Sequence, residues 1–184
     1  MKLLLHACCA PCSVMCIRTL RDEGIEPSLY WHNPNIHPYM EYVRRRDALA
    51  AYAKDLDLSL IMEDRYGLRD FLDALYRENA GPSKTAGRCA LCYRLRMEKT
   101  AKTAAEKGFE AFSTTLLISP YQDQRLIGEE GETAARRYGV RFLYRDFRPR
   151  FREGQAGARA LGIYMQKYCG CVFSEEERYL ETGG

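Results

Sequence analysis

Short apolar segments alternate with longer helical segments along almost the whole chain, and this alternation restricts the fold more than any other feature. Buried apolar runs predict five strands, at residues 2–7, 28–31, 58–63, 111–115 and 140–144. Amphipathic spacing and helix-ending residues predict helices at 13–23, 39–56, 68–78, 89–107 and 122–138, then a short helix at 155–161 and a last one from residue 174. Short strands separated by helices form parallel sheets that helices cover on both faces. We therefore expect an α/β fold, with a parallel sheet of about five strands flanked by helices and a C-terminal helical tail.

The length of 184 residues, without a recognisable linker, favours a single domain over residues 1–184. The apolar run at the start is about five residues long, shorter than the roughly 7–15 of a signal peptide. No stretch approaches the ~20 apolar residues of a membrane span. We therefore expect a cytoplasmic protein with no membrane partner. In that compartment, clustered thiols favour metal binding or catalysis over structural disulfides.

Eight cysteines fall in three tight groups, and thiols grouped in this way bind metal or exchange electrons. The groups are Cys8, Cys9 and Cys12 with nearby Cys16 after the first predicted strand, Cys89 and Cys92 at a helix start after the loop at 79–87, and Cys169 and Cys171 near the end. In a parallel sheet, the first group would lie beyond the carboxyl end of a strand, where sites form.

The first two groups allow three kinds of site. A Cys9–Cys12 pair at a helix start is typical of a thioredoxin-like site, with Cys9 as the activated thiolate. Together with Cys89 and Cys92, this pair also matches the spacing of a structural zinc site, although the gap between the pairs is wide. The same four thiols suit an iron–sulfur cluster, because helix dipoles and free N–H groups stabilise an anionic cluster. A radical-SAM site fails, since Met15 stands where CxxxCxxC needs its third cysteine.

The CxC group forms a separate unit. A disulfide across one residue closes a strained and easily reduced ring, and Gly170 removes a side chain where that ring is tightest. We interpret Cys169 and Cys171 as a switchable electron relay, with two extra metal ligands as the alternative. Cys16, four residues after Cys12 on an apolar helix face, is expected in the core.

Arginine outnumbers lysine 21 to 7, and seven arginines lie among five aromatic residues within 136–152. Arginine binds phosphates, and its plane, like an aromatic ring, stacks on unpaired bases, so this stretch is typical of an RNA-binding segment. Its strand aromatics and its two helical arginines, 136 and 137, also have ordinary structural roles. The expected RNA-binding residues are Arg44 and Arg45 on a helix, and Arg148, Arg150 and Arg152 in the loop after the last strand.

Six blocks of sequence carry a resemblance to a known family. They are LLHACCAPCS, WHNPNIHPYMEYVRRR, GRCALCYRLRMEKTA, FSTTLLISPYQ, RDFRP and QKYCGCVFSE. In this order they resemble the epoxyqueuosine reductase family QueH, from residue 3 to about 177. The resemblance implies a fold like that of the adenine-nucleotide alpha-hydrolase (PP-loop) group. CCAPC replaces the glycine-rich ATP loop of that group, so no use of ATP is expected.

The resemblance implies the last step of queuosine synthesis. The epoxide oxygen of epoxyqueuosine, at the wobble position of a tRNA anticodon, is removed with two electrons and two protons, and water is released. The implied partners are this tRNA and a separate electron donor. The implied cofactor is a 4Fe–4S cluster, without cobalamin. By position the cluster ligands are Cys8, Cys9, Cys89 and Cys92, and the redox-active pair is Cys169 with Cys171.

This ligand set leaves Cys12 as a spare thiolate that could hold an additional mononuclear iron. An iron with an open position would act as a Lewis acid toward the epoxide oxygen. By residue type His37, Tyr39 and Asp146 are candidate proton donors, although the first two could order the NPNIHPY loop and Asp146 could pair with nearby arginines. Two other functions stay open, a metal-free thiol–disulfide oxidoreductase and a zinc-stabilised RNA-binding module.

Overall fold

Parallel strands form the centre of the molecule. The computed structural model describes residues 1–81 and 87–180. Its five-stranded sheet has the order β3-β2-β1-β4-β5, and every neighbouring pair is parallel. The strands are β1 (Leu3–His6), β2 (Pro27–Trp31), β3 (Leu60–Met62), β4 (Ala111–Thr114) and β5 (Arg141–Phe142). The expected α/β fold with a five-stranded parallel sheet is confirmed.

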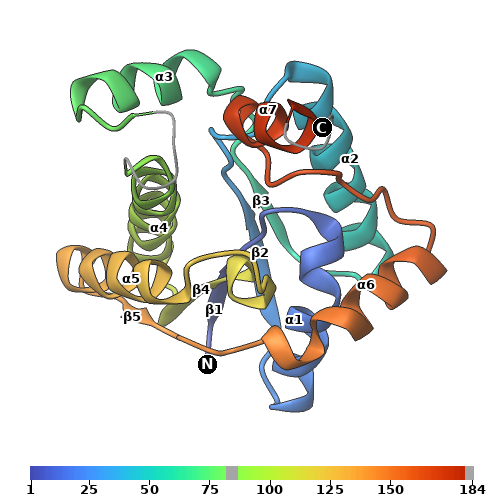
Figure 1. Ribbon diagram of the computed structural model, residues 1–184. Helices are drawn as coiled ribbons and strands as arrows, with labels where there is room; N and C mark the ends of the chain where they lie inside the picture. Colours follow the sequence, from blue (N-terminus) through green and yellow to red (C-terminus); the bar gives the residue numbers. More distant parts are fainter. Residues whose placement is uncertain (82–86, 181–184) are drawn as a thin grey trace.

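Helices cover both faces of the sheet (Figure 1). α1 (Ala10–Asp22) and α2 (Tyr39–Asp55) lie on one face, and α4 (Arg88–Glu106) and α5 (Gln124–Tyr138) pack together on the other. The other helical segments are α3 (Leu68–Arg77), the 3-10 turns η1 (Thr115–Ile118) and η2 (Arg148–Arg150), α6 (Phe151–Ala160) and α7 (Val172–Leu180). α6 packs on α1, and α6 and α7 form the expected C-terminal helical tail. None of the described helices is long and apolar enough to cross a membrane.

The central strands are buried along their whole length. Leu3, Leu4 and Leu5 of β1 are shielded from solvent, as is Phe112 of β4. A strand that helices cover on both faces needs apolar residues at consecutive positions, which is the pattern of these strands. This burial holds the strand ends, and the loops that follow them, in fixed positions.

The strand order changes direction at β1. From β1 the chain crosses through α1 to β2 on one side, and it later returns through α4 to β4 on the other side. In such sheets a crevice opens beyond the carboxyl ends of the two strands at the reversal. The segment with Cys8 follows β1 and the segment with Thr115 follows β4, so both border this crevice.

Some element boundaries differ from the prediction. β5 covers only residues 141–142, and α6 begins at Phe151 instead of 155. Glycine disfavours helix, yet Gly154 and Gly157 lie inside α6 because they let it approach α1. A Cβ at Gly154 would lie 3.2 Å from the side chain of Met15. Within the loop expected at 79–87, residues 82–86 lie outside the part of the chain that the structure describes.

Candidate metal and redox site

A cavity of about 1300 Å³ brings the three cysteine groups together. Seven of the eight cysteines line it, and Cys16 is buried in the core as expected. The cysteines of the wall are Cys8, Cys9, Cys12, Cys89, Cys92, Cys169 and Cys171. Their positions in the chain span more than 160 residues, so the fold itself assembles this set of thiols.

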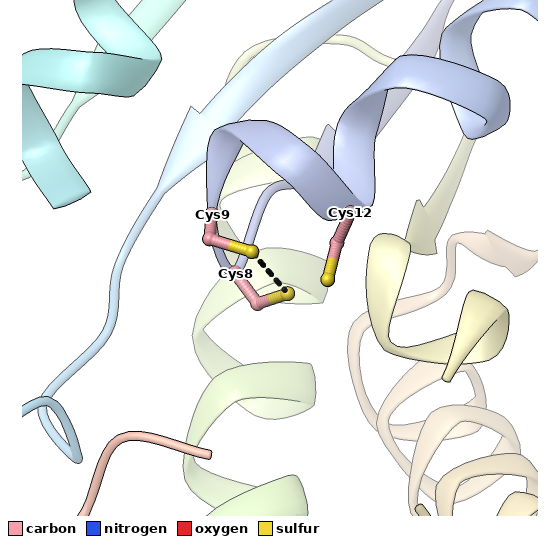
Figure 2. Close-up of side chains that lie close together, drawn as sticks. All are labelled: Cys8, Cys9 and Cys12. Atoms are coloured by element: carbon pink, nitrogen blue, oxygen red, sulfur yellow. Dashed lines mark hydrogen bonds between the residues drawn. The ribbon is translucent and has the colours of Figure 1, made fainter. Parts of the chain in front are cut away.

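The first group lies at the start of α1. The sulfurs of Cys8, Cys9 and Cys12 point toward one another (Figure 2), and their Sγ atoms all lie within 4.8 Å of one another. Pro11 occupies the first helical turn, where its missing N–H costs no hydrogen bond. Among the described residues this trio is the only group of three or more His, Cys, Asp or Glu ligand atoms that is close enough to hold one metal ion.

The pKa values of the three thiols are shifted in opposite directions. Hydrogen bonds from the thiols of Cys12 and Cys9 hold the pKa of Cys8 well below its usual value, although burial opposes this effect. The hydroxyl of Thr115 also donates to the Cys8 sulfur, at 3.2 Å. By contrast, the pKa of Cys12 is raised, first because its thiol donates to Cys8, and burial raises the pKa of Cys9. Of the three thiols, Cys8 therefore loses its proton most readily.

The second group lies at the start of α4, in the wall of the same cavity. Gly87 precedes this helix with φ of 91°, a conformation that favours glycine. Cys92 is buried, and burial raises its pKa to about 12, although the charge of Arg96 opposes the shift. The sulfurs of Cys89 and Cys92 do not belong to the close trio. The structure thus brings the four expected cluster ligands to one cavity rather than to one point.

Arg96 is a buried cation in this wall. It is 1% exposed, and its Nη2 donates to the sulfur of Cys92 at 3.0 Å and its Nε to the carbonyl oxygen of Cys92 at 3.1 Å. In the described part of the chain no carboxylate forms an ion pair with it. Burial alone would lower its pKa, but the negative potential of the Cys92 sulfur and other thiols raises it. A buried charge of this kind needs an anion nearby, and among the described residues the side chain that accepts a hydrogen bond from Arg96 is the Cys92 thiol.

The cavity as a whole is positive. Seven cationic side chains line it against the two acids Asp123 and Glu177. The cations are Arg45, Arg88, Arg96, Arg152, Arg159, Lys167 and Arg178. Glu177 is paired with Arg88 at 2.9 Å, and apart from this pair six cations face one acid. An anionic occupant is favoured in such a cavity.

The third group lies on the turn before α7. Cys169 is exposed and Cys171 is buried, and both are free thiols in the structure. Cys171 packs with Cys92 in a small apolar cluster. Gly170 between them has φ of 149°, and a Cβ there would lie 3.1 Å from Nδ2 of Asn35, so both backbone and space require glycine.

Arg45 holds this turn in place. Its guanidinium donates to the carbonyl oxygens of Cys169 at 2.8 Å and Tyr168 at 3.0 Å, and its Nε donates to Glu41 at 2.7 Å. It is 2% exposed. Arg45 is therefore held in the interior by contacts of all three guanidinium nitrogens, and its expected role in RNA binding stays a prediction. Arg44, the neighbouring residue, is exposed as an RNA contact requires.

The three candidate proton donors lie outside the lining of the cavity. His37 is buried, its Nε2 donates to the Pro34 carbonyl at 2.9 Å, and burial lowers its pKa to about 4. Tyr39 is 53% exposed and its ring packs edge-on against Tyr66. Asp146 accepts two hydrogen bonds from the guanidinium of Arg148, at 2.8 and 2.7 Å, and this pairing lowers its pKa. Each of the three makes structural contacts of this kind, and their role as proton donors stays a prediction.

The loop arginines divide into two kinds. Arg148 is bound to Asp146, and Arg150 is bound to Glu153 at 3.0 Å and to Asp22 at 3.3 Å. Arg152 lines the cavity and is exposed, and the described residues offer it no acidic partner. Of the three, Arg152 alone combines a free guanidinium with a place at the cavity.

Comparison with known proteins agrees with these features. The family model described as "Epoxyqueuosine reductase QueH" matches residues 3–177. The chain belongs to the QueH family. It is 39% identical over 178 residues to the epoxyqueuosine reductase QueH of Dehalococcoides mccartyi, covering 97% of this chain and 94% of that protein. It is 38% identical over 185 residues to that of Thermotoga maritima, covering 95% and 91%. QueH proteins are oxidoreductases by name.

A solved structure resembles the QueH chain in fold. It is described as a predicted subunit of tRNA methyltransferase from Methanocaldococcus jannaschii, with a TM-score of 0.52 over 84% of this chain and 76% of that one. At 15% identity this likeness concerns the fold alone. It agrees with the expected parallel α/β architecture.

The residues of the cavity fit the cluster that the QueH resemblance implies. Such a cluster needs thiolate ligands, and hydrogen bonds to the sulfurs adjust its potential. Besides Thr115 at Cys8 and Arg96 at Cys92, the side chain of Gln166 donates to Cys9 at 2.8 Å. Three of the four expected ligands thus already accept a hydrogen bond from a polar side chain.

Sequence reasoning missed Arg96 and Gln166. Arg96 lies four residues after Cys92 in a predicted helix, so helical spacing offered a signal that its guanidinium could reach that sulfur. Gln166 comes from the segment before the CxC turn, and no spacing rule connects it with Cys9. Such a contact depends on the path by which the C-terminal segment returns to the sheet.

Proposed function

We propose that this QueH chain is an epoxyqueuosine reductase that acts on the wobble nucleoside of a tRNA anticodon. It removes the epoxide oxygen with two electrons and two protons and releases water. One observation carries the proposal: a single positively charged cavity gathers all three cysteine groups. A metal-free thiol pair needs two of these thiols and a zinc knuckle four, whereas this wall has seven.

In the proposed site Cys8, Cys9, Cys89 and Cys92 hold a 4Fe–4S cluster, and Cys12 is left as a ligand for an additional mononuclear iron. When bound, these groups supply single electrons and a Lewis acid. Arg96 compensates the negative charge of the sulfur ligands from the buried side.

The CxC pair is proposed to deliver electrons and protons together. Oxidation of the Cys169 and Cys171 thiols to a disulfide releases two electrons and two protons, which equals what loss of the epoxide oxygen as water consumes. The electron donor then reduces the disulfide again. The exposure of Cys169 suits contact with that donor, and the packing of Cys171 beside Cys92 suits transfer inward.

The reaction is tested by nucleoside mass spectrometry. Epoxyqueuosine-containing tRNA is incubated anaerobically with the iron–sulfur-reconstituted protein and a strong reductant, and we expect queuosine, one oxygen lighter. Cys169→Ser should abolish multiple turnovers with a thiol donor, whereas Cys16→Ala, outside the cavity, should retain them. No conversion by a protein with an intact cluster would overturn the substrate assignment.

Metal analysis of the same samples separates the other functions. Iron and sulfide in the active protein support the proposal, whereas a colourless, iron-free active protein would show a thiol–disulfide oxidoreductase. Zinc without activity would show an RNA-binding module. Cys12→Ala should keep the cluster but lose the additional iron, and a variant with full iron content and activity would remove Cys12 from the ligand set.

A further inference from the structure

Tyr121 is an exposed aromatic residue at the edge of the cavity. Its side chain is 79% exposed and still belongs to the lining. The ring of Phe151, from α6, supports it at a centroid distance of 5.8 Å and an angle of 84°. Phe151 is itself half-buried and packed against the core, so it fixes the position of the Tyr121 ring, which stays largely exposed to solvent.

Exposed cations line the same cavity as this ring. Arg152, Arg159 and Lys167 are exposed and line the same cavity, and no ion pair joins any of them to an acid in the described part of the chain. Asp123 is the acid nearest in sequence, and its carboxylate accepts the backbone N–H of Leu126 at the start of α5. The cavity lining thus combines an exposed aromatic ring with unpaired positive charge.

Exposure alone does not make such a site. Tyr76 of α3 is 87% exposed, yet it does not line the cavity. Among the described residues no other aromatic ring packs against it. Tyr121 differs because Phe151 packs against its ring and because it lines the same cavity as the cations and the thiols. Every nucleobase has a face that stacks on an aromatic ring, and arginine and lysine bind the flanking phosphates.

We propose that Tyr121, supported by Phe151, is a stacking subsite for an unpaired RNA base next to the nucleoside that enters the cavity. Arg152, Arg159 and Lys167 bind the phosphates on either side of that base. The inference rests on the proposed function and adds the contact that selects a single-stranded loop over a duplex. Two of these cations, Arg159 and Lys167, fall outside the arginine-rich stretch of the sequence.

The test measures binding of a synthetic anticodon stem-loop RNA that lacks the modified base, by fluorescence anisotropy. Tyr121→Ala should weaken binding about 5-fold to 100-fold, the range expected for one stacked base. Tyr121→Phe and Tyr121→Trp should bind like the parent protein, because both keep an aromatic face. Tyr76→Ala is the matched control and should bind unchanged.

A second arm tests the cations through salt. Arg152→Gln and Arg159→Gln should each weaken binding and reduce the slope of log affinity against log salt by about 1. Arg148→Gln should leave the slope unchanged, because Asp146 already occupies that guanidinium. Circular dichroism verifies that each variant is folded.

The outcomes distinguish the two proposals. Normal binding by Tyr121→Ala, with normal binding by the parent protein, would overturn the stacking subsite and leave the reductase proposal standing. Equal affinity of the parent protein for the stem-loop and for a fully paired duplex of the same length would also overturn it. A parent protein that binds no stem-loop RNA at all would overturn both proposals.

Discussion

Arg96 donates to the sulfur of Cys92 across 3.0 Å, one helical turn away along α4. Because a guanidinium stays protonated at any physiological pH, this contact places a permanent positive charge in the wall of the cavity. When Cys92 is a thiolate ligand, the contact becomes a charge-assisted hydrogen bond. The charge of Arg96 should therefore favour the more negative, reduced state of a bound cluster.

Replacement of Arg96 should lower the potential of the cluster. In Arg96→Met the midpoint potential should fall on the order of 60 mV or more, the one-electron equivalent of one hydrogen bond to a charged group. Anaerobic redox titration followed by electron paramagnetic resonance measures it. Arg94→Met, two residues earlier on the same helix and paired with Glu78 outside the lining, is the control. An unchanged potential in a loaded Arg96→Met protein would contradict the electrostatic role.

Gly170→Ala should displace the CxC turn. The added Cβ meets Asn35, Ile36 and Arg45, and φ of 149° is unfavourable for any side chain. We expect at least a tenfold loss of queuosine formation while iron content stays normal. Gly162→Ala is the control, since φ there is 66° but nothing lies within 4 Å of the added carbon. Equal activity of the two variants would show that the position of the turn does not matter.

Arg45→Met should destabilise the protein strongly. It removes one partner of a buried ion pair and leaves the carboxylate of Glu41 without its cation, which typically costs 3–5 kcal/mol of unfolding free energy. Urea unfolding of the metal-free protein measures the change. Arg44→Met, on the exposed side of the same helix, should change stability by less than about 0.5 kcal/mol. A similarly small loss of stability in both variants would contradict a stabilising role for the buried Arg45–Glu41 pair.

Acid should destabilise the fold through His37. Burial lowers its pKa to about 4 from 6.5, so between these values the unfolded chain binds the extra proton. The contribution of His37 to the free energy of unfolding is constant above pH 6.5. It falls by about 2 kcal/mol as the pH is lowered from 7.5 to 5. His37→Gln should reduce the difference in unfolding free energy between these pH values by that amount. Both proteins are measured metal-free in the same buffers, so that the contributions of the cysteines to the pH dependence are the same in each and cancel in the comparison.

Apolar runs and helix signals predict most of the fold because both depend on local sequence. The site is predicted in outline for a related reason: cysteines after β1 and at the start of α4 must face the crevice where strand order reverses. The run Arg44–Arg46 shows where local reasoning ends. Consecutive helical positions point in three directions, so Arg44 is exposed, Arg45 is buried and Arg46 pairs with Asp64. Which of them meets the interior depends on the return path of the C-terminal segment.

In the loop after β5, the sequence also does not reveal which arginines are paired with acids. Arg148, Arg150 and Arg152 are equivalent in composition, yet acids close in space occupy the first two. Asp22 is far from Arg150 in the sequence and near it only after α6 packs on α1. Charge availability is thus a tertiary property. The single-domain organisation and the ligand roles of individual cysteines stay predictions.

The wall of the cavity takes thiols from residues 8–12, 89–92 and 169–171, which lie near the start, the middle and the end of the chain. During synthesis on a ribosome, the third group emerges after the other two. Until it has emerged and the chain has folded, the set of thiols is incomplete and is not yet shielded from oxygen. We therefore expect the proposed cluster to be inserted into a folded apoprotein.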